Sequence, residues 1–166
     1  MIPAICVIGS KSNSGKTTLI EKLIRELKSR GFKVATIKHD GHNFDIDHPG
    51  KDTWRHRQAG ADVVMISSSS QLAMIKQLDN EVPLDDLIAM IEGVDIIIVE
   101  GYKKGDKPKI EVFRSEVHES LFCKPEELLA IASDVKFDIG VPSFDINDAG
   151  GIVDFLEEKF LVSTRF

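Results

Sequence analysis

The stretch CVIGSKSNSGKTTLIEKL, near the N-terminus, contains the residue types that bind nucleotide phosphates. Such a site needs backbone N–H groups that point into one hollow, a helix N-terminus behind them, a flexible cation and a hydroxyl group for Mg²⁺. Lys16 would reach the β and γ phosphates, Thr17 would bind Mg²⁺, and Gly15 lets the backbone approach closely. Ser14 and Thr18 can add contacts from their N–H groups. The spacing therefore predicts a phosphate-binding loop.

The loop departs from the usual pattern at one position, where Ser10 stands in place of a glycine. Gly9 lies one place earlier and can make the tight turn, and Asn13 belongs to a run of small turn formers. An ordinary strand-to-helix turn would explain the small residues but not a lysine and two threonines at the helix start. Lys11 matches the position of a lysine that reaches across a dimer in one subclass of these loops, but an exposed loop lysine is the favoured interpretation.

Two residues of the segment VEGYK, Glu100 and Lys103, are further candidates for the site. Ligands of α/β sheets bind beyond the carboxyl ends of the strands, and Glu100 ends the most apolar run, DIIIVE. Its carboxylate could orient Mg²⁺-bound water or the attacking water, so we assign Glu100 and Lys16 to catalysis and Glu100 and Thr17 to the metal. Lys103 could bind a second phosphorylated ligand. We expect the next lysines, Lys104, Lys107 and Lys109, to form a solvated turn.

The segment KHDGHNFDIDHPGKD is rich in histidine and carboxylate side chains. Its spacing matches no closed metal motif, although His39, His42 and His48 could bind zinc or nickel. We favour a mobile loop over the phosphates that nucleotide would order. We expect this loop to place Asp45 and Asp47 near the metal, and Asp52 near the nucleotide or a second substrate.

The segment AIASDV offers a candidate for recognition of the base. The carboxylate of Asp134 could accept hydrogen bonds from N1 and the exocyclic amino group of guanine, which adenine does not offer in the same pattern. This favours GTP over ATP. The alternative is that Asp134 caps the turn that follows.

Alternating strand and helix patterns must position these residues. Apolar runs predict strands near 4–9, 33–38, 62–67, 72–76, 95–100, 110–113, 128–133 and 141–145. Helical patterns follow the phosphate loop up to Gly31, begin with Asp52 or Thr53 as the N-cap and stop at Gly60, run from Pro83 to Gly93, and open at Asn147 or Asp148. They predict one α/β domain over residues 1–166, with the three-layer P-loop NTPase fold, a mostly parallel central sheet and helices on both faces.

The composition excludes several classes of protein. The chain has 166 residues, 42% of them hydrophobic and 29% charged, and a net charge of −6, which argues against a protein that coats nucleic acid. Cys6 and Cys123 lie far apart and without a CxxC pair, as expected of reduced thiols. The apolar N-terminus is too short to span a membrane. We therefore expect a cytoplasmic protein that interacts with neither nucleic acid nor membrane.

The segments SNSGKTTLIEKLI, IKHD, DIDHPGKDTWRHRQAGA, VEGYK, IASD and DINDAGG together resemble the molybdopterin-guanine dinucleotide biosynthesis protein B (MobB) family. The resemblance implies a dimeric, GTP-binding P-loop protein with weak GTPase activity. Its partners would be the molybdenum cofactor and the guanylyltransferase MobA, which makes the guanine dinucleotide form. Lys11 departs from the family, which often has an aromatic residue there.

Two other functions stay open. A small-molecule kinase would need arginines from a lid, for which Arg55, Arg57 and Arg114 are the central candidates. A GTP-dependent metal-insertion protein would use the three histidines of the polar segment.

Overall fold

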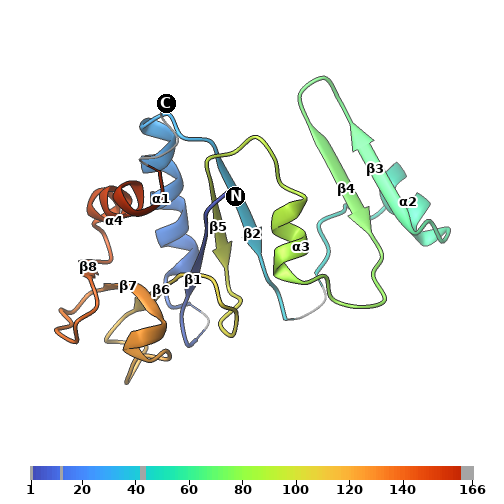
Figure 1. Cartoon of the computed structure of the whole chain (residues 1–166). Helices are drawn as coiled ribbons and strands as arrows, with labels where there is room; N and C mark the ends of the chain where they lie inside the picture. The colour runs from blue at the N-terminus through green and yellow to red at the C-terminus, as the bar shows by residue number, and fades with distance from the viewer. Residues whose placement is uncertain (1, 12, 42–43, 162–166) are drawn as a thin grey trace. The chain divides into compact units, whose positions relative to one another are not determined.

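The computed structural model of the chain describes residues 2–11, 13–41 and 44–161. They form two compact units: the first combines the chain up to His39 with the chain from Leu84 onward, and the second is Asp40–Pro83 (Figure 1). That both units act as one nucleotide-binding domain stays a prediction.

The first unit is built on a sheet of six parallel strands in the order β2-β5-β1-β6-β7-β8. The strands are β1 Ala4–Ile8, β2 Val34–Lys38, β5 Ile96–Glu100, β6 Lys109–Phe113, β7 Leu128–Ser133 and β8 Ser143–Asp145. All of them lie where the apolar runs predict, and the α/β fold with a mostly parallel sheet is confirmed. The arrowheads of β2 and β5 in Figure 1 point to the edge at which the carboxyl ends meet.

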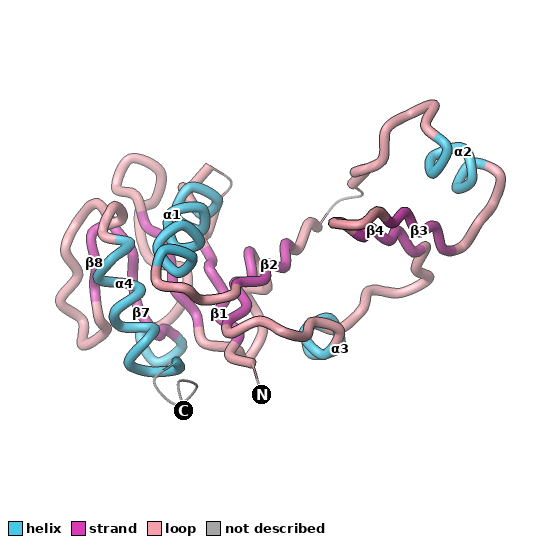
Figure 2. Tube along the Cα trace, turned by 90° about the horizontal axis from the view of Figure 1, so that it is seen from above, coloured by secondary structure: helices cyan, strands magenta, loops and turns pink. Residues whose placement is uncertain are grey.

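Helices cover both faces of this sheet. They are α1 Lys16–Ser29, α3 Leu84–Ala89 and α4 Ala149–Leu156, with a 3₁₀ turn η1 Pro125–Glu127 and a π-helical turn η2 Glu157–Leu161. Helices α1 and α4 pack together over one face (Figures 1 and 2). The other face packs against residues of α3 and against Cys123. Burying each aliphatic side chain of such a core contributes about 2 kcal/mol.

The helix ends mostly follow the sequence signals. Gly31 adopts a left-handed φ of 87° after α1, and Asp148 caps α4 by accepting a hydrogen bond from the Gly151 N–H at 2.9 Å. Helix α2 (Asp52–Gln58) differs, because its N-cap is Lys51, whose side chain makes no capping bond. The prediction that Asp52 or Thr53 caps this helix is therefore wrong.

The second unit has no share in the parallel sheet. It contains α2 and an antiparallel hairpin of β3 (Val63–Ser67) and β4 (Leu72–Lys76), and most of the remainder is loop (Figure 2). Most side chains of the two strands are exposed. The apolar runs thus located the two strands correctly, but the strands form a separate antiparallel sheet and not part of the parallel one.

Candidate functional site

The predicted phosphate loop connects β1 to α1 at the carboxyl edge of the sheet. Its left-handed residues are Asn13, with φ 61°, and Gly15, with φ 92°. Ser10 has no positive φ, so no glycine is needed there. Gly9 is required for space instead, because a Cβ atom on it would lie 2.5 Å from the Ser14 Oγ. The usual pattern has a glycine at position 10, but this loop needs its glycine at position 9, where the Ser14 side chain lies close to the backbone.

Lys16 is the first residue of α1, and its ammonium group folds back onto the loop. Its Nζ donates to the Lys11 carbonyl at 2.9 Å and to the Ser14 Oγ at 3.1 Å. Burial lowers the pKa of Lys16, and the carboxylate of Glu100 opposes part of that shift. The Lys16 ammonium therefore contacts two oxygens of the loop, and it would leave them to contact phosphates.

Thr17 and Glu100 lie together, as the metal prediction requires. The Thr17 hydroxyl donates to the Glu100 carboxylate, 3.2 Å from both oxygens. Parallel pairing explains the placement, because Glu100 ends β5 level with Val7 of β1, shortly before the loop. Lys38, at the end of β2, is 4.0 Å from the same carboxylate. A hydroxyl and a carboxylate are hard oxygen donors and fit the ligand preference of Mg²⁺.

A cavity of about 310 Å³ lies on the other flank of the loop. It is lined by residues of α1 and its loop and by residues that follow β6, β7 and β8: Gly15, Thr18, Leu19, Lys22, Arg114, Glu116, Asp134, Ile146 and Asn147. Asp134, which we predicted to read the base, is therefore on the wall of a cavity that adjoins the phosphate loop.

Ser115 fixes the carboxylate of Asp134. The Ser115 N–H donates to its two oxygens at 2.9 and 3.1 Å, and the Ser115 hydroxyl donates at 3.0 Å. These bonds, the backbone one first, lower the pKa of Asp134. The carboxylate keeps free lone pairs and stays charged.

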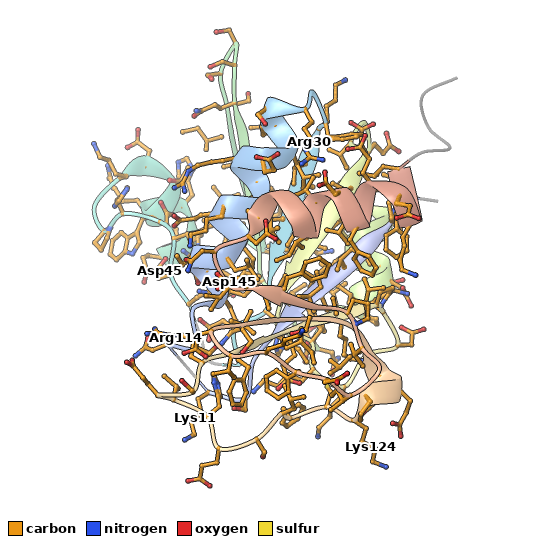
Figure 3. The ribbon with its side chains drawn as sticks, turned by 90° about the vertical axis from the view of Figure 1, so that its left-hand side faces the viewer. Lys11, Arg30, Asp45, Arg114, Lys124 and Asp145 are labelled. Atoms are coloured by element: carbon orange, nitrogen blue, oxygen red, sulfur yellow. The ribbon has the colours of Figure 1, made fainter. Side chains whose placement is uncertain are left out.

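Arg114 also lines this cavity, although we named it from the sequence only as a candidate lid arginine of a kinase. Its Cδ lies 3.7 Å from the position of a Cβ on Gly15, and its guanidinium is 3.3 Å from Glu116. Figure 3 shows Arg114 and Lys11 at the same edge of the first unit. Arg114 directly follows β6 as Gly101 follows β5, so its place after a strand end is the signal that could have identified it.

The turn after β5 is tight. Gly101 has φ 102° and Tyr102 has φ 54°, a left-handed conformation that costs a residue with a side chain about 1 kcal/mol or more. The ring of Tyr102 lies 4.5 Å from that of His39. Lys103 comes next, and its Nζ donates to the Ser10 carbonyl at 3.0 Å.

The other lysines of this segment are not all in a solvated turn. Lys104 is exposed, but Lys107 pairs with Asp85 at 2.6 Å. Lys109 is only 5% exposed and donates to the Gly105 carbonyl at 2.5 Å. The expectation is wrong for Lys109 because its chain position belongs to β6, where the side chain is buried.

The predicted residues Asp45, Asp47 and Asp52 belong to the second unit. Arg57 lies 3.2 Å from Asp45 and 3.8 Å from Asp47, and the Thr53 hydroxyl donates to Asp47 at 2.9 Å. The Asp47 N–H and Arg57 lower the pKa of Asp45. These contacts hold the loop onto α2, while roles toward metal, nucleotide or second substrate stay predictions.

The histidines form no metal cluster in the part of the chain that the structure describes. No group of three or more His, Cys, Asp or Glu residues there is placed to hold a metal ion. The backbone N–H of His48 donates to the Asp47 carboxylate, and His42 lies outside the described residues. Nor is any helix of the described segments long and apolar enough to cross a membrane.

Comparison with known proteins gives a consistent result. The sequence model of MobB, described as molybdopterin guanine dinucleotide synthesis protein B, matches residues 4–134. The chain is 38% identical over 158 residues to the molybdopterin-guanine dinucleotide biosynthesis adapter protein of Haemophilus influenzae, covering 94% of this chain and 88% of that protein. It is also 38% identical, over 168 residues, to the protein of the same name from Escherichia coli, covering 95% and 93%.

A solved structure supports the same relationship. The crystal structure of Bacillus subtilis MobB matches with a TM-score of 0.73 and 27% identity, covering 93% of this chain and 98% of that chain. The similarity therefore includes both the first and the second unit.

Proposed function

The chain belongs to the MobB family, and from this premise we propose that it is an adapter in the biosynthesis of molybdopterin guanine dinucleotide. In this proposal it binds Mg²⁺ and GTP, hydrolyses GTP weakly, and assists a MobA-type guanylyltransferase that acts on the molybdenum cofactor. It does so in the cytoplasm.

The geometry of the phosphate loop is the observation that carries the nucleotide proposal. Lys16, at the start of α1, can exchange the Lys11 carbonyl and the Ser14 hydroxyl for the β and γ phosphates. The loop amides and the N-terminus of α1 supply further N–H donors. Gly9, Asn13, Gly15 and Thr18 complete the backbone that surrounds the phosphates.

Thr17 and Glu100 support the metal part of the proposal, because their oxygens already meet at 3.2 Å. Bound Mg²⁺ would offset the charge of the phosphate oxygens. Glu100 would orient a water molecule for attack on the γ phosphate. Asp45 and Asp47 remain proposed contributors to the metal site, and Asp52 to that of a second substrate or partner. Lys103 is bonded to the Ser10 carbonyl, so its ammonium would have to leave that oxygen to contact such a ligand.

Arg57 is the kinase candidate that the structure argues against. Its side chain is mostly buried and lies 3.2 Å from Asp45 and 3.8 Å from Asp47. A guanidinium held in this way is not free to stabilise the charge that develops on a transferring phosphoryl group, as an arginine finger does. Among the described residues, Arg55 and Arg114 have only exposed ion pairs, which are weak.

The cavity beside Gly15 supports the choice of GTP. Asp134 lies on its wall with its carboxylate charged and oriented by Ser115. A carboxylate accepts hydrogen bonds but cannot donate them, so it favours guanine, which offers N1–H and an amino group.

The hairpin of the second unit supports a homodimer. Apolar side chains stand exposed on it, between 45% and 66% of their surface: Val63, Met65, Ile66, Leu72 and Met74. A two-stranded sheet alone is marginally stable in water, and its edges offer unpaired N–H and C=O groups. A second copy of the same hairpin would cover these groups symmetrically.

The test is a reconstitution with purified MobA-type guanylyltransferase, molybdenum cofactor and Mg-GTP. We expect the chain to associate with the enzyme and to increase formation of the guanine dinucleotide. Lys16→Ala should remove the stimulation, and Lys11→Ala should keep it, because only the backbone of Lys11 contacts Lys16. Neither stimulation nor association with the wild-type chain would contradict the adapter function.

A further inference from the structure

Lys103 lies against the phosphate loop rather than in solvent. The left-handed residues Gly101 and Tyr102 reverse the chain after β5. Lys103 is partly buried there, and its Nζ donates to the Ser10 carbonyl at 3.0 Å. The segment after β5 is thus connected to the loop after β1 by a charge-assisted hydrogen bond.

A phenylalanine holds the Lys103 ammonium from another direction. The Nζ of Lys103 is 5.1 Å from the centre of the Phe122 ring, within cation–π range. Phe122 is 50% exposed, although its backbone is tightly fixed. Glu111, only 1% exposed in β6, accepts the Phe122 N–H at 2.6 Å and the Cys123 N–H at 3.0 Å.

The buried carboxylate is itself beside the loop. Glu111 pairs in register with Ile8, the last residue of β1 before the phosphate loop. A continuous set of contacts therefore runs from Glu111 through Phe122 and Lys103 to Ser10. Glu111 is fixed by the sheet, and Lys103 follows the tight turn at Gly101 and Tyr102.

Lys16 and Lys103 hold neighbouring carbonyls of the loop, but their situations differ. Lys16 donates to Lys11 and must leave that carbonyl when it binds phosphate. Lys103 can keep its bond to Ser10. The C=O and N–H of a trans peptide point in opposite directions, so holding the Ser10 carbonyl also fixes the direction of the Lys11 N–H. Anion binding by such loops depends on the directions of their N–H groups.

We propose that Lys103 is a positioning residue for the phosphate loop, held by Phe122 and Glu111, which orients the Ser10–Lys11 peptide for triphosphate binding. The proposal rests on the proposed nucleotide function, and it differs from direct contact of Lys103 with a phosphorylated ligand. Under direct contact, the ammonium would leave Ser10 and the loop would not depend on Phe122.

Two measurements on the full chain test the proposal. Hydrogen exchange of the segment 9–16 in nucleotide-free protein reports on the loop alone. Equilibrium titrations with GTP and with GMP then separate phosphate binding from base and ribose binding. The variants are Lys103→Met, Lys103→Arg and Phe122→Leu, and the control is Lys104→Met at the exposed neighbour.

We expect Lys103→Met to speed exchange in the loop and to weaken GTP binding about tenfold, with GMP binding changed less than about twofold. Phe122→Leu should act in the same direction, by about threefold, without a change of charge. Lys103→Arg should restore both readouts, since a guanidinium can donate to the carbonyl and stack on the ring. Lys104→Met should resemble the wild type.

Loop exchange in Lys103→Met equal to that in Lys104→Met would overturn the proposal, and so would weaker GTP binding with unchanged exchange, which indicates direct phosphate contact. If the wild type binds no GTP, the nucleotide function fails while the exchange data still decide the role of Lys103. If Lys103→Met does not fold, Lys103→Arg and Phe122→Leu decide it by the same two readouts.

Discussion

The two compact units differ in where they place apolar and charged side chains. The first buries its central strands β1 and β5 from both faces and places Lys16, Thr17 and Glu100 together at the carboxyl edge of the sheet. The second exposes the apolar residues of β3 and β4 and buries the carboxylate of Asp47 against Arg57. The difference teaches why we propose separate roles for the two units: the charged edge of the first suits a small anion, and the exposed apolar hairpin of the second suits association.

The largest expected effect concerns the first unit. Lys16→Ala removes the cation of the phosphate loop, and we expect GTP affinity to fall roughly a thousandfold, or about 4 kcal/mol. Lys11→Ala, the control, should change it less than threefold. Equilibrium titration measures both, and circular dichroism checks the fold. Retained affinity in Lys16→Ala would remove the assigned phosphate site.

The next effect should stay within the second unit. Arg57→Ala leaves Asp47, whose side chain is 8% exposed, without its counter-charge, and we expect about 3 kcal/mol less stability there. Hydrogen exchange over residues 44–58 measures it. Arg55→Ala is the control, because the Arg55 side chain is 71% exposed and 4.0 Å from Asp52. An equal loss in both variants would contradict the role of the Arg57 contacts.

A smaller effect tests association through the hairpin. Met65 is 57% exposed and lies opposite Met74 across the two strands. Met65→Asp should weaken the dimer about thirtyfold, because a charge would be buried in an apolar interface. Sedimentation gives the dissociation constant, with Ser70→Asp in the hairpin turn as the control. A dimer of unchanged strength would exclude this hairpin as the interface, and unchanged GTP binding is expected in both variants.

The smallest effect concerns base choice in the first unit. Asp134→Asn replaces an acceptor with a group that also donates, so the preference for GTP over xanthosine triphosphate should fall about fivefold. Competition titrations measure the ratio. Equal affinity of the wild type for GTP and ATP would remove the base role of Asp134.

Much of the first unit could be predicted from sequence because its signals are local. Runs such as DIIIVE identify buried strands, and the phosphate loop lies between a strand and an amphipathic helix. The meeting of Thr17 with Glu100 also follows, since parallel strands end at a common edge.

Other features depend on contacts between distant residues. The run VVMIS has the apolar, β-branched residues of a strand, but nothing in it indicates that β3 pairs only with β4 and stays mostly exposed. The bond from Lys103 to Ser10 joins residues 93 positions apart, and the pairing of Arg57 with Asp45 depends on how the loop folds onto α2. Residue type alone suggested ligand roles for Lys103, Arg57 and Asp45.

Titration of the wild-type chain with GTP, in the presence of Mg²⁺ and again with the metal chelated, tests the central claim most directly. The account predicts one GTP bound per chain through the phosphate loop, with affinity reduced at least tenfold when Mg²⁺ is removed, because no ion would then offset the phosphate charge at the proposed Thr17 and Glu100 site. No GTP binding, or binding that is equally strong without Mg²⁺, would contradict it.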